Sequence, residues 1–68
     1  MLKHFKITMT CTDPSDQSHL SVDKETVTSS MTNAQVEAHK LLNRLEDNFG
    51  LTVDQVIVRE IYKGTGRV

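Results

Sequence analysis

The sequence is poor in the residues that cross-link or stiffen small proteins. Its 68 residues include one cysteine, one proline, three glycines, three aromatic residues and no tryptophan. A lone Cys11 excludes a disulfide within the chain and favours a reducing, cytoplasmic setting. With so few aromatic residues, the core must be aliphatic and modest, and its stabilisation only equals the ordering entropy or falls below it. Association with a second copy, as a homodimer, would add the stability that such a core lacks.

The sequence also lacks the patterns of export, membrane insertion and metal binding. Its first residues contain no apolar segment of the kind found in secretion signals, and no run approaches the length of a membrane span. The single cysteine and the three histidines show no close pairwise spacing of zinc ligands. The glycines at 64 and 66 open no helix, so they do not resemble a nucleotide loop. We therefore predict no enzyme activity, metal or cofactor.

Apolar and polar residues alternate over residues 3–12, which predicts a half-buried strand. Its inward positions are Phe5, Ile7, Met9 and Cys11. A turn around Pro14 leads into a second strand, in which Leu20 and Val22 face inward and the residues at 19, 21 and 23 face outward. Val27 is out of phase with Val22, so we expect a bulge near residues 23–25, unless the strand ends there.

The strongest local signal is that of a helix over residues 33–49. A capping box begins at Thr32, and Met31 with Val36 fits the hydrophobic staple that accompanies such a box. Gly50 follows where a left-handed residue commonly ends a helix. The apolar stripe of this helix consists of Ala34, Ala38, Leu41, Leu42, Leu45 and Phe49.

A third strand is predicted over residues 55–62, with apolar residues on both faces. The element order β-β-α-β then predicts an α+β fold with a three-stranded antiparallel sheet, order 2-1-3, and one helix packed on one face. We assign residues 1–63 to this domain and residues 64–68 to a flexible tail. One sheet face and two sheet edges are left without cover, and such surfaces bind other chains.

These open surfaces favour a small non-enzymatic protein-interaction module. It would self-associate, or bind another protein, through a sheet edge or the open sheet face. Small accessory, inhibitory and phage-type proteins are built in this way, which is an analogy of architecture alone. The apolar residues that the fold leaves exposed on the third strand locate the contact. The predicted partner-binding residues are Ile57, Arg59, Ile61 and Lys63.

The alternative is a nucleic-acid-binding module. The net charge of −1 conceals an uneven distribution, because the two terminal segments are basic and the middle of the chain is acidic. In the predicted sheet those segments meet at one end and could contact phosphates. The cations concerned are Lys3, Lys6, Arg59, Lys63 and Arg67. The shortage of exposed aromatic residues for base stacking weakens this alternative.

Overall fold

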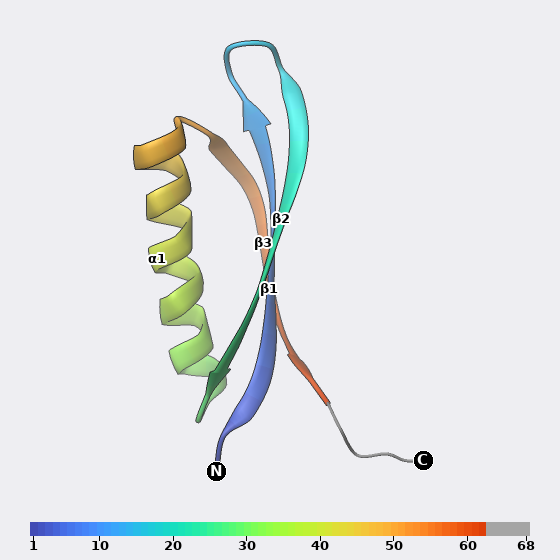
Figure 1. Ribbon diagram of the computed structural model, residues 1–68, viewed down its shortest axis with the longest axis vertical. Coiled ribbons are helices and arrows are strands. Elements are labelled where there is room, and N and C mark those ends of the chain that lie inside the picture. Colours follow the sequence, from blue (N-terminus) through green and yellow to red (C-terminus); the bar gives the residue numbers. More distant parts are fainter. Residues whose placement is uncertain (63–68) are drawn as a thin grey trace.

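The computed structural model describes residues 1–62, which form one antiparallel sheet and one helix (Figure 1). The elements are β1 (Lys3–Asp13), β2 (Ser18–Thr28), α1 (Met31–Phe49) and β3 (Thr52–Ile61). The three strands lie in the order β2-β1-β3, and both outer strands are antiparallel to β1. The predicted α+β class and sheet order are confirmed. The predicted tail, together with Lys63 and Arg67, lies outside the described residues.

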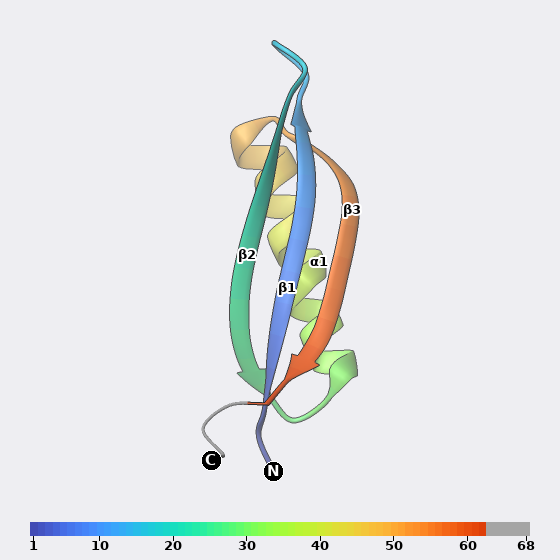
Figure 2. The same ribbon diagram turned by 90° about the vertical axis from the view of Figure 1, so that its right-hand side faces the viewer.

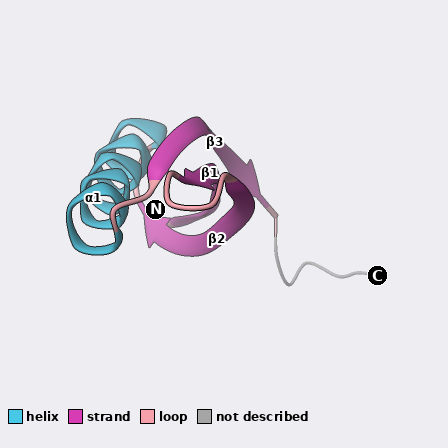
Figure 3. Cartoon of the chain, turned by 90° about the horizontal axis from the view of Figure 1, so that it is seen from above, coloured by secondary structure: helices cyan, strands magenta, loops and turns pink. Residues whose placement is uncertain are grey.

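The core lies between β1 and α1, which crosses one face of the sheet diagonally (Figures 2 and 3). We call this side of the sheet the inner face. The inward side chains of β1 are at most 1% exposed. Opposite them, Ala34, Ala38 and Leu45 are the buried residues of α1. Small alanine side chains let the helix approach the sheet closely, and Leu41 and Leu42 complete the contact at half-buried positions. The core residues of β1 are Phe5, Ile7, Met9 and Cys11.

The helix begins two residues earlier than its sequence pattern suggests. Ser30 is the N-cap, with extended backbone, and its hydroxyl accepts a hydrogen bond from the Asn33 amide at 3.2 Å. The capping box predicted at Thr32 is therefore wrong, and so is the staple between Met31 and Val36. Both serine and threonine are good caps, and the structure uses Ser30 in place of Thr32. Val36 is left 49% exposed on the side of the helix away from the sheet.

The helix ends at Phe49 and is capped by Gly50, as its sequence indicates. Gly50 adopts the left-handed conformation, with φ of 66°, and its amide donates to the Glu46 carbonyl. The next amide, from Leu51, donates to the Leu45 carbonyl at 3.3 Å, and the Leu51 side chain packs against the core. Phe49 is predicted to belong to the buried stripe, but it is 68% exposed and does not contribute to it.

The second strand contains no bulge, contrary to expectation. Every residue of β2 pairs with β1 in one unbroken register, from Ser18 opposite Asp13 to Thr28 opposite Lys3. The strand keeps its alternation, so Val27 faces away from the helix and is 50% exposed. At the inward positions of β2 opposite Ile7 and Phe5 the residues are the polar Lys24 and Thr26. The alternation of hydrophobicity fails there, while the hydrogen-bonded ladder continues.

The bulge lies instead in β3, which begins earlier than predicted. Thr10 pairs with Gln55 but Cys11 pairs with Val53, so Asp54 is the extra residue. This insertion breaks the period of two between Val53 and Val56, both of which lie opposite inward residues of β1. The broken period explains why the sequence pattern indicates a start only at residue 55. The turn between β1 and β2 is held by carboxylates, since Asp13 accepts from the Ser15 amide at 3.0 Å and Asp16 from the Ser18 amide at 3.0 Å.

Candidate protein contact surface

The side of the sheet away from α1, which we call the outer face, is not covered by any helix or strand of the described residues (Figures 1 and 2). Side chains that pair directly across an antiparallel sheet lie on the same face, so the register defines rows that run from β2 through β1 to β3. Five such rows cross the outer face. Their central residues, from the start of β1 to its end, are His4, Lys6, Thr8, Thr10 and Thr12.

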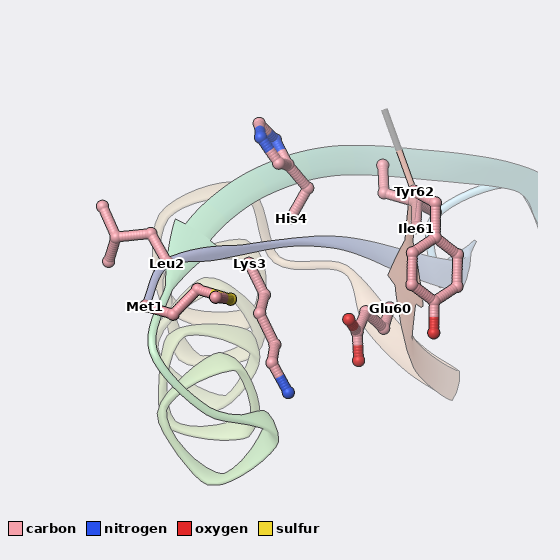
Figure 4. A pocket seen from close by; sticks show the side chains of 7 residues that line it. All are labelled: Met1, Leu2, Lys3, His4, Glu60, Ile61 and Tyr62. Carbon is pink, nitrogen blue, oxygen red and sulfur yellow. The ribbon is translucent and has the colours of Figure 1, made fainter. Parts of the chain in front are cut away.

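The first row forms an apolar end of the outer face. His4 lies between Val27 of β2 and Ile61 of β3, and Leu2 precedes it. Leu2 is 69% exposed and Val27 is 50% exposed, whereas Ile61 and His4 are half-buried. Leu2 and His4 project to one side of the chain and Lys3 to the other (Figure 4). We call Leu2, Val27 and Ile61 the apolar end. Uncovered aliphatic side chains gathered around one imidazole are typical of a contact surface.

The second row is charged and divides the outer face by sign. Glu25 of β2, Lys6 of β1 and Arg59 of β3 lie side by side. The Lys6 Nζ atom is 4.0 Å from Asp23 Oδ2 of the next row, an exposed pair of small energetic value. In these two rows, the negative charges of Asp23 and Glu25 lie on β2, and the positive charges of Lys6 and Arg59 lie on β1 and β3. A surface with this division favours one orientation of an approaching partner.

The third row adds an exposed aliphatic residue. Ile57 lies directly opposite Thr8 and is 46% exposed. Along β3 the structure thus places Ile57, Arg59 and Ile61 on the outer face, three of the four residues that the sequence pattern selects for partner binding. The fourth, Lys63, lies outside the described residues. Sequence reasoning missed Leu2, which precedes β1, and Val27 of β2, and both join the same surface.

The proposed basic patch is divided by the sheet. Lys6 and Arg59 are cross-strand neighbours on the outer face. Lys3 is an odd number of residues from Lys6 and projects from the opposite side, near Glu60 (Figure 4). Lys63 and Arg67 lie outside the described residues. Of the three predicted cations among residues 1–62, the structure brings Lys6 and Arg59 together and places Lys3 apart from them.

The last row contains a polar network that the sequence did not indicate. The Thr12 hydroxyl donates to Asp54 Oδ2 at 2.6 Å, and its oxygen lies 3.2 Å from His19 Nδ1. The single hydroxyl proton of Thr12 is donated to Asp54, so the Thr12 oxygen accepts a hydrogen bond from the Nδ1–H group of His19. In a hydrolytic triad the imidazole lies between the hydroxyl and the carboxylate, whereas here the hydroxyl lies between the other two. The network ties the three strands together and does not activate the hydroxyl.

Cys11 is a core residue and not an available nucleophile. Its side chain is 0% exposed. Burial raises the pKa of the Cys11 thiol, and the negative charges of Asp54 and Glu46 raise it further. The reactive thiolate is thereby disfavoured. Among residues 1–62, no group of three or more histidine, cysteine, aspartate or glutamate side chains is placed to hold a metal ion.

A shallow hollow of about 530 Å³ lies at the end of the sheet where β1 begins and β3 ends (Figure 4). Lys3 and Glu60 project into it from neighbouring strands, beside the Tyr62 ring. Met1 and Tyr62, which form part of its wall, are almost fully exposed to solvent. Walls this open cannot withdraw a small ligand from water, so the hollow does not have the form of a small-molecule site.

The described part of the chain contains no helix with both the length and the apolar character of a membrane span. The outer face, with its apolar end and divided charge, is the surface best suited to contact another molecule. No family model, no curated protein and no solved structure matches the chain.

Proposed function

We propose that this chain is a small non-enzymatic protein-interaction module that binds its partner through the outer face. The observation that carries the proposal is the set of apolar side chains left in water there, with Leu2, Val27 and Ile57 between 46% and 69% exposed. Covering one such side chain completely is worth about 1.5–3 kcal/mol relative to full exposure, and these side chains would gain the exposed part of that amount.

The polar residues of the outer face would give the contact its specificity. Acidic Asp23 and Glu25 lie on one strand, and basic Arg59 lies two strands away. A partner must match this division of charge, because a reversed orientation would place like charges opposite each other. The threonines of β1 occupy most of the central strand on this face. Unlike long charged side chains, they need no ion-pair partner when another molecule covers them.

The remaining candidate groups support binding and not catalysis. The thiol is enclosed in the core, and the Thr12 hydroxyl donates its proton to a carboxylate. A free buried cysteine is also compatible with the reducing cytoplasm, where we propose that this accessory protein acts. Nucleic-acid binding is the second candidate, supported by the neighbouring Lys6 and Arg59. It is opposed by Asp23, which approaches Lys6 on the same face.

The experiment compares two lysine substitutions at aliphatic residues of similar exposure. Ile57→Lys alters the outer face, and Val36→Lys alters the far side of α1, where the starting exposures are 46% and 49%. We expect Ile57→Lys to reduce recovery of the bound protein from an extract of the source cells at least about tenfold, since a desolvated ammonium costs more than 1.4 kcal/mol. The Val36→Lys variant should retain the partner.

Circular dichroism first establishes that both variants are folded. A differently tagged copy of this chain is added to the extract as a candidate partner. The captured proteins are identified by mass spectrometry. Equal recovery with the two variants would contradict the outer face as the contact surface. An oligonucleotide that binds at low salt, with an affinity that falls steeply as salt is added, would favour the second candidate instead.

A further inference from the structure

The first two rows of the outer face are complementary to themselves under one symmetry operation. We propose that two copies of the chain stack outer face on outer face, about a two-fold axis parallel to β1. The proposal rests on the proposed function, because it assigns a partner, a second copy, to the same contact surface. Its additional content is the operator, and hence which residues of one copy lie opposite which residues of the other.

A two-fold axis along β1 exchanges the outer strands while preserving the rows. In a face-to-face pair, β2 of one copy lies over β3 of the other, and β1 lies over β1. The apolar end then meets its equivalent, with Val27 opposite Ile61 of the second copy. In the next row, Glu25 lies opposite Arg59 of the second copy. Both the apolar contact and the charge contact occur twice, as an isologous interface requires.

The alternative two-fold arrangements match these residues less well. An in-plane axis across the strands would place the apolar end against the polar row of Thr12 and His19, leaving aliphatic groups opposite hydroxyl and imidazole groups. Pairing of sheet edges would leave the apolar end in water. A second copy that paired with the β2 edge would meet three successive charged residues, 23–25. At the β3 edge, the bulge at Asp54 interrupts the ladder.

Lys6 lies near the axis and would approach its equivalent in the second copy. Its ammonium group is 4.0 Å from Asp23 within the same chain, so each positive charge already has a negative neighbour. The pair is exposed in one copy and would be less screened between two sheets. This row therefore aligns the copies through Glu25 and Arg59, while the lysines limit the affinity.

The size of the outer face also indicates a weak dimer. Five rows at about 6.8 Å and three strands at about 4.8 Å span about 34 by 14 Å. Two copies would cover on the order of 1,000 Å² in total, which is at the lower limit for specific association. We therefore expect a dimer at about 100 µM that dissociates on dilution to about 1 µM.

A charge-swap experiment tests the facing pair directly. The variant Arg59→Glu places glutamate opposite glutamate at both symmetric contacts, and Glu25→Arg places arginine opposite arginine. Each variant alone should sediment as a monomer at a concentration at which the unchanged chain is a dimer. In an equimolar mixture, every glutamate meets an arginine of the other variant, so a heterodimer should form. Sedimentation velocity and light scattering measure these states.

The matched control is Lys40→Glu, the same reversal of charge on the exposed surface of α1, where Lys40 lies 3.7 Å from Glu37. This variant should remain dimeric, and circular dichroism should show that all variants are folded. An unchanged chain that remains monomeric at 100 µM, a dimeric Arg59→Glu variant, or a mixture without heterodimer would each overturn the proposal. A failure of the dimer is distinguished from a failure of the proposed function by the Ile57→Lys capture experiment. That experiment still reports whether another protein binds the outer face.

Discussion

Replacing Ile7 by alanine is expected to lower the free energy of unfolding by about 3 kcal/mol, within the range for large-to-small core substitutions. The Ile7 side chain is 0% exposed and belongs to the core between β1 and α1. Removal of three carbon atoms loses apolar burial and leaves a cavity that the two-layer structure cannot fill. A chain of 68 residues has a total stability on the order of 3–10 kcal/mol. A large share of the stability would therefore be lost.

Urea denaturation followed by far-ultraviolet circular dichroism measures this loss at low protein concentration. The matched control is Ile57→Ala, the same substitution on the neighbouring strand and the opposite face, where the side chain is 46% exposed. We expect a loss of less than about 1 kcal/mol for the control, since much of that side chain is already in water. Equal losses at the two positions would mean that the inner face is not the core.

Enlarging Ala38 to leucine is expected to destabilise the fold by about 1–3 kcal/mol. Ala38 is 4% exposed and packs against the core residues of β1. Additional carbon atoms must displace either the helix or the strand beneath it, because the interface is already closely packed. Leucine and alanine differ little in helix propensity, so the effect arises from packing.

The control for this substitution is His39→Leu, one residue further along the helix and exposed to solvent. It introduces the same side chain without a steric conflict and should change stability by less than about 0.5 kcal/mol. Thermal unfolding of both variants gives the comparison. A stabilised Ala38→Leu variant would show that a void, and not a close contact, lies between α1 and the sheet.

Those parts of the fold with a clear hydrophobic period could be predicted from the sequence. The alternation of β1 specifies its inward residues, and Ala34, Ala38 and Leu45 repeat at helical spacing. Gly50 indicates the end of the helix because its left-handed conformation suits glycine. The central position of β1 follows from its alternation together with the short first turn and the crossover by α1.

The errors occur where backbone hydrogen bonding, and not side-chain burial, decides the structure. Serine and threonine at the helix start are equivalent by propensity, and the chain uses Ser30 as its cap. In β2 the ladder continues in register even though Val27 becomes exposed. In β3 the extra residue, Asp54, conceals the true start of the strand.

These errors also limited the prediction of the contact surface. Ile57, Arg59 and Ile61 alternate within one regular segment, so their common face follows from the sequence. A bulge in β2 would have turned Val27 inward, and only the unbroken register assigns it to the apolar end. The contact between Thr12 and Asp54 depends on the bulge in β3, which no local pattern indicates.

The most direct test of the outer face as a contact surface is cross-linking through a cysteine introduced at its centre. Thr8 lies in the middle row of β1, on the proposed two-fold axis, whereas the native Cys11 is buried and should not react in the folded protein. Treating the folded Thr8→Cys variant at about 100 µM with a short bis-maleimide should give a covalent dimer as the main product.

A cysteine introduced by Val36→Cys, on the far side of α1, serves as the control and should remain monomeric under the same conditions. We expect efficient cross-linking at position 8 and little at position 36. Equal cross-linking at the two positions, or cross-linking at position 36 alone, would contradict the stacking of outer faces.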